Sequence, residues 1–215
     1  MVSSGLMDYA AERAKMVDQQ LRRRGIADTR VLAAMGEVPR ERFVPDTEKA
    51  RSYYDGALPL SQGQTISQPL IVAMSAEALR LQGHENVLEI GAGSGYQAAV
   101  LSKLAEHVTA VEIIPELVDG AKQVIESLDI HNVDVVCADG RLGWPPRAPY
   151  DGIVVAAAAE EIPAALVDQL AEGGRLVIPV GSQWGQSLQV SSKRGDELQT
   201  EELCHCVFVP LVYGS

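Results

Sequence analysis

The feature that most constrains this chain is a glycine-rich segment, NVLEIGAGSGYQAA, at residues 86–99. Its apolar start has the length of a buried strand, and the residues from Gln97 onward are good helix formers. Between them, Gly91, Gly93 and Gly95 leave out side chains where a ligand must approach the backbone, and a helix N-terminus presents free N–H groups. The segment predicts a strand–turn–helix unit that binds a nucleotide-like ligand.

The spacing of the glycines indicates the kind of ligand. A dinucleotide-binding turn has the pattern G-x-G-x-x-G/A, in which the third small residue lets helix and strand pack closely. Here Gly95 comes one residue early and bulky Tyr96 follows it, which disfavours an NAD-dependent dehydrogenase. With Glu89 at the strand end, the pattern E-x-G-x-G-x-G resembles motif I of the class I S-adenosylmethionine-dependent methyltransferases. In that superfamily the turn holds the amino-acid part of the cofactor. The resemblance implies cofactor contacts from Glu89, Gly91, Gly93, Ser94 and Gly95.

From residue 86 onward, strand and helix patterns alternate. We expect strands at 86–90, 107–112, 132–138, 150–156 and 174–180, and helices near 94–105, 116–128 and 162–171. Such repeats predict a parallel sheet covered by helices on both faces. Two further strands at 187–193 and 203–211, joined by a turn at Gly195-Asp196, predict an antiparallel ending. The expected fold class is α/β, a Rossmann-like, doubly wound, mostly parallel seven-stranded sheet with an N-terminal helical extension.

The residues before the glycine turn are expected to form helices and an irregular segment. Gly25 is a helix stop, and Asp28 is in position to cap a second helix. A long irregular segment such as 46–66 is typically functional or disordered. We expect one domain over residues 1–215. Its parts are N-terminal helices and an active-site segment (1–82), a cofactor-binding βα core (83–181) and C-terminal strands (182–215).

Acidic residues follow the next two expected strands. In open α/β folds, ligands bind at the carboxyl ends of the strands, where an acid can bind both ribose hydroxyls. Glu112 is in place for that role, and the alternative is a solvated strand end. Asp139 could accept a hydrogen bond from an adenine amino group while Gly140 lets the base approach, although Asp-Gly is also an ordinary turn. Together with the glycine turn, these residues predict an adenosyl pocket.

Composition argues against several classes of protein. A net charge of −11 disfavours a nucleic-acid partner, because such proteins neutralise phosphates with Lys and Arg. The dense basic run Arg22-Arg23-Arg24 ends an expected helix, where it complements the helix dipole. No apolar run reaches the roughly 18 residues that span a membrane, and the start of the chain lacks a secretory signal. We expect no nucleic-acid or membrane partner and a cytoplasmic location.

Two further groups of residues could suggest a functional site but have structural explanations. On a strand, Cys204 and Cys206 share one face and His205 points away, and no second ligand pair of zinc spacing exists, so we expect no metal site. Three cysteines are too few for a disulfide framework, which favours a reducing compartment. Ser67 stands before a helix that has Pro69 in its first turn, which predicts an N-cap. It has no obvious base nearby in the sequence, which disfavours a nucleophile.

Longer segments resemble the protein-L-isoaspartate O-methyltransferase family, from about Arg13 to Gly181. TISxP at residues 65–69 is the discriminating motif, because generic methyltransferases share the glycine turn but lack it. The C-terminal VPL at 209–211 resembles the family's final strand. The segments that carry the match are MVDQQL (16–21), RGI (24–26), VPR (38–40), FVP (43–45), GQTISQP (63–69), VLEIGAGSGYQAAVL (87–101), DG (139–140), APYD (148–151) and GGRLVIPVG (173–181).

The resemblance implies methyl transfer from S-adenosylmethionine to the free α-carboxylate of L-isoaspartyl residues in damaged proteins and peptides, giving a methyl ester and S-adenosylhomocysteine. It implies that Ser67 is the active-site serine and that Gln64, Thr65, Ile66 and Ser67 fold over the cofactor. Ala156 and a short C-terminus depart from the family pattern and put the C-terminal wall of the pocket in doubt. The alternatives are a class I methyltransferase with another acceptor and a non-catalytic protein that binds S-adenosylmethionine. We expect a monomer.

Overall fold

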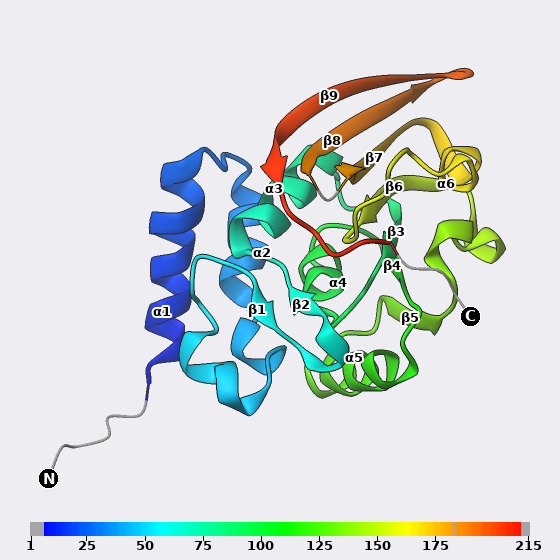
Figure 1. Cartoon of the computed structure of the whole chain (residues 1–215). Helices are drawn as coiled ribbons and strands as arrows, with labels where there is room; N and C mark the ends of the chain where they lie inside the picture. The colour runs from blue at the N-terminus through cyan, green and yellow to red at the C-terminus, as the bar shows by residue number, and fades with distance from the viewer. Residues whose placement is uncertain (1–6, 183, 212–215) are drawn as a thin grey trace, which may run out of the picture.

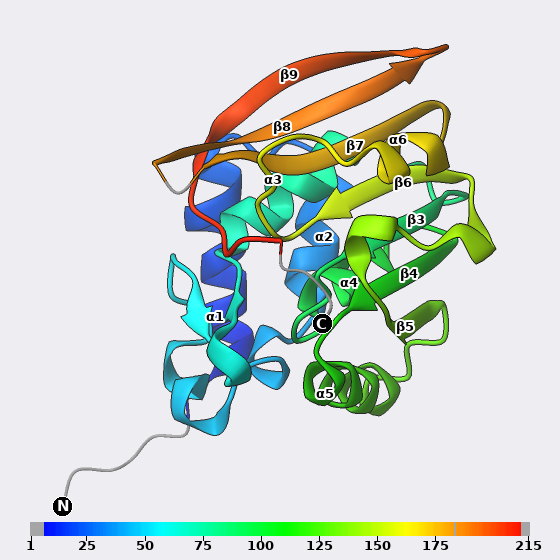
Figure 2. The same ribbon diagram turned by 45° about the vertical axis from the view of Figure 1, so that its right-hand side comes forward.

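The computed structural model describes residues 7–182 and 184–211. Its centre is a seven-stranded sheet with the order β5-β4-β3-β6-β7-β8-β9. β5, β4, β3, β6 and β7 run parallel, and β8 and β9 are antiparallel to their neighbours. β9 and β5 lie at opposite ends of the sheet (Figures 1 and 2). The strands are β3 (Asn86–Ile90), β4 (His107–Glu112), β5 (Val133–Cys137), β6 (Tyr150–Val155), β7 (Leu170–Ser182), β8 (Gly185–Arg194) and β9 (Glu197–Cys206).

Helices cover both faces of the sheet, as the sequence predicts. Val87 and Leu88 are neighbours in β3, and they point into different hydrophobic clusters because side chains alternate along a strand. Ala99 and Val118, from α4 and α5, share the cluster of Val87, whereas Leu166 of α6 shares that of Leu88. The helices that follow the active-site segment are α3 (Pro69–Leu79), α4 (Tyr96–Leu101), α5 (Pro115–Ser127) and α6 (Ala164–Gln169).

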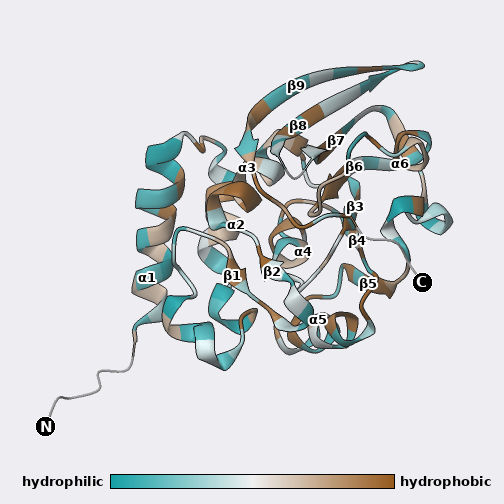
Figure 3. Ribbon diagram, in the orientation of Figure 1, coloured by the Kyte–Doolittle hydropathy of each residue, from teal (hydrophilic) through white to brown (hydrophobic). Residues whose placement is uncertain are grey.

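An N-terminal helical layer packs against the α3–α4 side of the sheet. Gly25 ends the first helical run with a φ of 103°, and the Asp28 carboxylate caps α2 by accepting from the backbone N–H groups of Arg30 and Val31. Both features confirm the sequence predictions. Hydrophobic residues gather where α2, α3 and α4 meet the sheet, while the outer side of α1 is hydrophilic (Figure 3). The elements of this layer are α1 (Tyr9–Met16), a π-helical turn (Val17–Leu21), a 3-10 turn (Arg22–Arg24) and α2 (Thr29–Glu37).

The irregular segment between α2 and α3 consists of short turns and one small hairpin. β1 (Leu58–Pro59) and β2 (Thr65–Ile66) pair antiparallel, with Leu58 opposite Ile66. This hairpin delivers residues 64–67 to the carboxyl edge of the central sheet. The turns are 3-10 helices at Arg40–Arg42, Asp46–Arg51 and Ser61–Gly63.

The predicted bounds of the last strand are wrong, whereas the strand expected at 187–193 lies within β8. The last strand was expected at 203–211, but β9 covers Glu197–Cys206 and residues 207–211 leave the sheet. The turn at Gly195-Asp196 is where the sequence places it. After β9, the chain crosses to the end of β6, where the Ala158 N–H donates to the Val209 carbonyl at 2.8 Å and the Leu211 N–H donates to the Ala158 carbonyl at 2.8 Å. Pro210 forms an isolated parallel bridge with Ala158.

Among residues 7–182 and 184–211, no helix has the length and apolar character needed to cross a bilayer.

Candidate active site

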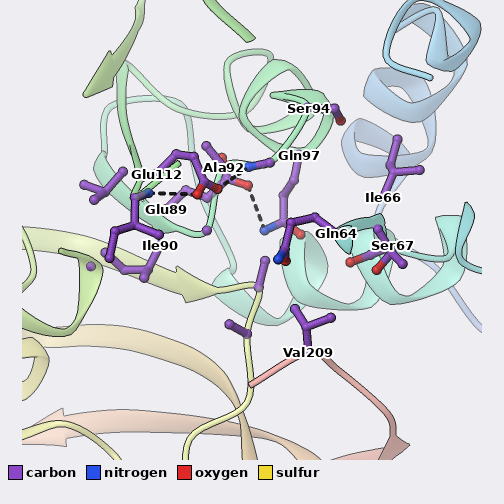
Figure 4. A pocket seen from close by; sticks show the side chains of 18 of the residues that line it. Gln64, Ile66, Ser67, Glu89, Ile90, Ala92, Ser94, Gln97, Glu112 and Val209 are labelled. Atoms are coloured by element: carbon purple, nitrogen blue, oxygen red, sulfur yellow. Dashed lines mark hydrogen bonds between the residues drawn. The ribbon is translucent and has the colours of Figure 1, made fainter. Parts of the chain in front are cut away.

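A pocket opens at the carboxyl ends of the central strands (Figure 4). Segments far apart in the sequence line it: residues 64–67, most of the glycine turn, residues 111–114 and residues 209–211. The structure thus brings the TISxP segment, the glycine turn and the end of β4 together, as the sequence predicts. Of the predicted site residues, those on the pocket wall are Gln64, Thr65, Ile66, Ser67, Glu89, Gly91, Gly93, Ser94, Glu112 and Gly140.

The glycine turn needs its glycines for two different reasons. Gly91 and Gly93 have φ values of 83° and 54°, a left-handed backbone that side chains rarely adopt, and both line the pocket. Gly95 has a φ of 84° but does not line the pocket. A Cβ at Gly95 would lie 3.2 Å from the Cβ of Ala121 in α5. Gly95 therefore serves the packing of the turn against α5, and its predicted contact with the cofactor stays a prediction.

Glu112 holds the glycine turn to the end of β4. Its Oε2 accepts a hydrogen bond from the Gly93 N–H at 2.9 Å, and its Oε1 accepts from the N–H groups of Ile113 and Ile114 at 2.8 and 3.0 Å. The side chain is largely buried, and backbone N–H groups donate hydrogen bonds to both of its carboxylate oxygens. A carboxylate oxygen has more than one acceptor site, so Glu112 retains the capacity to bind hydroxyl groups of a ligand.

Glu89 is a completely buried acid on the pocket wall. Its Oε1 accepts from Nε2 of Gln97 at 3.2 Å, and its Oε2 has no hydrogen-bond partner among the described residues. Burial raises the pKa of Glu89 to about 8, with a smaller contribution from the charge of Glu112, against the lowering effect of the Gln97 hydrogen bond. An orphaned carboxylate oxygen facing a pocket matches a cationic or hydrogen-bond-donating ligand group.

Ser67 lies on the opposite wall from Glu89, between β2 and α3 (Figure 4). The N-cap of α3 is Gln68, and no side chain caps the helix, so the predicted N-cap role of Ser67 is wrong. The reason is that Gln68 has a non-helical backbone and Pro69 occupies the first helical position, so the helix begins one residue later than a cap at Ser67 requires. The Ser67 backbone is held instead, since its carbonyl accepts from Nη2 of Arg40 at 2.8 Å.

The end of β5 contributes Gly140 but not Asp139. A Cβ at Gly140 would lie 2.3 Å from Cγ2 of Ile90, so only glycine fits this part of the wall. Asp139 caps a 3-10 turn by accepting from the Arg141 N–H at 3.0 Å, and it forms an ion pair with the Arg141 side chain. Asp139 is absent from the pocket wall, so its predicted contact with an adenine amino group stays a prediction.

The C-terminal segment forms part of the pocket wall. The pocket lining includes Val209, Pro210 and Leu211 together with Ala156 and Ala157, and Val209 is labelled in Figure 4. The pairing with Ala158 described above fixes this segment at the end of β6. Ala156, which departs from the family's sequence pattern, therefore lies on the surface of the pocket.

Sequence reasoning missed Gln97 and Arg40. Gln97 lies on the first turn of α4, and the only signal for it was its position just after the glycine turn, on a helix that starts beside the acid of β3. Arg40 was noted only as part of a family motif. Its partners are backbone carbonyls distant in sequence, which no residue pattern reveals.

The cysteine-rich end of β9 does not form a candidate centre. His205 is exposed while Cys204 and Cys206 are partly buried against the core, as the strand alternation predicts. Among residues 7–182 and 184–211, no group of three or more His, Cys, Asp or Glu side chains is placed to hold a metal ion.

The parallel sheet with its antiparallel C-terminal hairpin, and the glycine turn flanked by Glu89 and Glu112, define a class I S-adenosylmethionine-dependent methyltransferase. The chain belongs to the protein-L-isoaspartate(D-aspartate) O-methyltransferase (PCMT) family, whose model matches residues 11–215.

Individual relatives agree with the family assignment. The chain is 50% identical over 203 residues to a protein-L-isoaspartate O-methyltransferase of Aliivibrio salmonicida, covering 94% of this chain and 97% of the relative. It is 53% identical over 209 residues to a protein-L-isoaspartate O-methyltransferase 2 of Pelobacter propionicus, covering 96% and 93%.

Solved structures show the same fold. A protein-L-isoaspartate O-methyltransferase structure matches with a TM-score of 0.84 and 32% identity over 92% of this chain, which spans 65% of that solved chain. A Plasmodium falciparum structure described as a protein-L-isoaspartate O-methyltransferase in complex with S-adenosyl-L-homocysteine matches with a TM-score of 0.79 and 26% identity, covering 93% of this chain and 98% of that one.

Proposed function

We propose that this protein is a repair methyltransferase that methylates the free α-carboxylate of L-isoaspartyl residues in damaged proteins and peptides. The observation that carries the proposal is the position of Ser67 in one pocket with Glu89 and the glycine turn. The family membership and the relatives' names support the same activity. A class I methyltransferase with a different acceptor is the alternative, and the TISxP segment on the pocket wall speaks against it.

The residues present fit S-adenosylmethionine. The orphaned Oε2 of Glu89 suits the cationic amino group of the cofactor, and Glu112 suits the ribose hydroxyls. Gly91, Gly93 and Ser94 would hold the amino-acid part, and Gly140 would let the adenine approach, with Asp139 proposed to accept from its amino group. When bound, the cofactor supplies a methyl group on a sulfonium, and transfer to a carboxylate oxygen gives a methyl ester and S-adenosylhomocysteine.

The carboxylate that accepts the methyl group needs to be oriented by the protein more than it needs to be activated. A peptide α-carboxylate has a pKa of about 3.5 and is ionised at pH 7, so it requires no general base. Ser67 and Thr65 would orient this carboxylate by donating hydrogen bonds, while Gln64 and Ile66 close the segment over the cofactor. Orientation of two reactants in one site reaches effective molarities of roughly 10⁵ M or more. Because the net charge is −11, local donors rather than the overall field must attract the anionic acceptor.

The remaining features of the proposal concern the whole molecule. We propose a single domain over residues 1–215 that acts as a monomer in the cytoplasm, with isoaspartyl proteins and peptides as its partners and neither nucleic acid nor membrane among them. The excess of 29 acidic over 18 basic residues supports the absence of a nucleic-acid partner.

The test is methyl transfer from S-adenosylmethionine with a labelled methyl group to a short peptide that contains one L-isoaspartyl residue. The matched control is the same peptide with normal aspartate. Base-labile label on the isoaspartyl peptide alone is the expected result. Absence of label, with S-adenosylhomocysteine binding intact by calorimetry, would identify a different acceptor or a non-catalytic binding protein.

A further inference from the structure

Arg40 is a completely buried cation that lies behind the pocket wall. Its Nε donates to the Ser52 carbonyl at 2.8 Å, and its Nη2 donates to the Ser67 carbonyl at 2.8 Å. The salt bridges among residues 7–182 and 184–211 do not include Arg40, and its Nη1 has no hydrogen-bond partner in that part of the chain. Its charge is therefore met by backbone carbonyls and by aromatic contact rather than by a carboxylate.

A buried charge of this kind opposes folding unless its interactions are well placed. Desolvating a guanidinium is costly, and the partial compensation here comes from the two hydrogen bonds that this charged group donates to backbone carbonyls. An apolar residue of similar volume would avoid the desolvation altogether. Stability therefore does not explain a guanidinium at this place, and we look for its role in the two groups that it contacts.

The second contact of Arg40 is with the other half of the pocket. Its guanidinium carbon lies 4.8 Å from the centre of the Tyr96 ring, a cation–π distance. Tyr96 is buried, begins α4 directly after Gly95, and packs edge-on against Phe43 with ring centres 5.5 Å apart. Arg40 therefore touches the serine wall through a carbonyl and the glycine-turn wall through an aromatic ring.

The segment on which Arg40 rests is itself anchored. Next to Ser52, the Tyr53 carbonyl accepts from Nε2 of Gln20 at 2.9 Å. Asp55 then accepts from Nε2 of Gln68 at 2.6 Å and from Nη1 of Arg24 at 2.8 Å. Residues 52–55 are thus linked to Ser67 through the Arg40 guanidinium and to Gln68 through the Asp55 carboxylate, so a shift of Arg40 is transmitted to the serine wall.

We propose that Arg40 is a positioning residue that fixes the distance between Ser67 and the glycine turn, and hence between the methyl acceptor and the cofactor. This inference rests on the proposed function of the pocket. Arg40 acts through the Ser67 backbone and through Tyr96 without touching substrate. Misplacement of reacting groups by about 1 Å costs on the order of 100-fold in rate. We therefore expect kcat to fall when the contacts of Arg40 with the Ser67 carbonyl and the Tyr96 ring are lost.

The test compares Arg40→Lys with Arg42→Met. Lysine keeps the charge but lacks the planar fork that reaches two carbonyls. Arg42 belongs to the same 3-10 turn but donates to the Ser127 hydroxyl at the surface, which makes it the matched control. We expect Arg40→Lys to lower kcat on the isoaspartyl peptide by about tenfold or more while the Kd for S-adenosylhomocysteine changes less than about threefold. Arg42→Met is expected to match the wild type in both.

A double-variant experiment separates positioning from general support of the fold. If Arg40 acts through Ser67, then Arg40→Lys in a Ser67→Ala background lowers kcat by much less than it does in the wild type. Independent, additive losses would overturn the proposal, as would an unchanged kcat in Arg40→Lys or a loss of cofactor affinity in proportion to kcat.

Amide hydrogen exchange tests the positioning even where the acceptor assignment fails. Arg40→Lys is expected to speed exchange in peptides covering residues 64–68, and Arg42→Met to leave it unchanged. If the wild type itself does not methylate the isoaspartyl peptide, the proposed function fails and exchange decides the role of Arg40. Unchanged exchange at 64–68 in Arg40→Lys would overturn that role.

Discussion

The carboxylate of Glu112 at the end of β4 accepts a hydrogen bond from the Gly93 N–H at 2.9 Å, so one side chain ties the glycine turn of β3 to the neighbouring strand. The same carboxylate accepts two further backbone N–H groups from its own chain end. The side chain proposed to bind the cofactor ribose therefore also sets the shape of the turn proposed to bind the cofactor's amino-acid part.

This double role predicts the effect of Glu112→Gln. The amide replaces one acceptor oxygen by a donor that faces backbone N–H groups, and hydrogen bonds to a charged acceptor are worth about 1.5–3 kcal/mol each. We expect the Kd for S-adenosylhomocysteine to rise by about tenfold or more, measured by calorimetry. Glu116→Gln, at an exposed position in the first turn of α5, is the control and should bind like the wild type. Unchanged binding in Glu112→Gln would remove Glu112 from the cofactor site.

Glu89 predicts a pH-dependent contribution to stability. The pKa of its carboxyl is about 8 in the folded protein and about 4.3 in an unfolded chain, so the folded state keeps its proton over a range where the unfolded state has released it. The contribution of Glu89 to stability is therefore fully present below about pH 4.3 and is lost as the pH rises towards 8.

Glu89→Gln removes this titration while retaining an amide oxygen that accepts from Gln97. In the absence of cofactor, we expect the variant to gain about 1 kcal/mol or more over the wild type in free energy of unfolding as the pH goes from 5 to 8. Denaturant titrations at the two pH values measure this difference. Exposed Glu161→Gln serves as the control. Parallel pH profiles for Glu89→Gln and the wild type would contradict the raised pKa.

Ser67 and Ser94 lie on the acceptor and cofactor sides of the pocket, and their alanine variants should separate the two functions. We expect Ser67→Ala to lower kcat by about tenfold or more with little change in the Kd for S-adenosylhomocysteine, because the hydroxyl orients the acceptor. Ser94→Ala should act mainly on that Kd. Steady-state kinetics and calorimetry on the same preparations measure both quantities. Equal losses in turnover and affinity for Ser67→Ala would make Ser67 a structural residue.

Two glycines with different surroundings test the packing of the pocket wall. At Gly140 a Cβ would lie 2.3 Å from Ile90 Cγ2, so Gly140→Ala should destabilise the protein by about 1–3 kcal/mol and weaken S-adenosylhomocysteine binding. At Gly120 in α5 a Cβ meets nothing within 4 Å, so Gly120→Ala should stabilise by about 0.5–1 kcal/mol and leave activity unchanged. Thermal unfolding and calorimetry measure these effects. Equal stability changes at the two positions would contradict the packing described here.

The sequence predicts the central sheet well because its signal is local. Each parallel strand is an apolar run bounded by polar or glycine residues, as at Asn86–Ile90, and both faces of such strands must be buried. The end of β9 is less predictable, because residues 207–211 are as apolar as a strand yet leave the sheet after Cys206 and pair with Ala158 instead. Whether residues 207–211 extend β9 or pair with Ala158 depends on where the end of β6 lies in the folded protein.

The residues of the candidate site also fall into a group that the sequence predicts and a group that it does not. Glu89, Glu112 and Ser67 come from motifs whose spacing is fixed along the chain, and the structure gathers all three in one pocket. The roles of Gly95 and Arg40 depend on contacts across the fold, with Ala121 for the former and with the Ser52 and Ser67 carbonyls for the latter. Residue type and spacing contain no information about such partners.

The most direct test of the account is the ratio of kcat/KM for two peptides of identical sequence, one with an L-isoaspartyl residue and one with normal aspartate. A pocket that orients a free α-carboxylate beside Ser67 predicts a ratio of about 100 or more in favour of the isoaspartyl peptide, since orientation of the reacting group dominates the rate. Comparable values for the two peptides, in a protein that binds S-adenosylhomocysteine, would contradict the central claim that this site selects isoaspartyl residues.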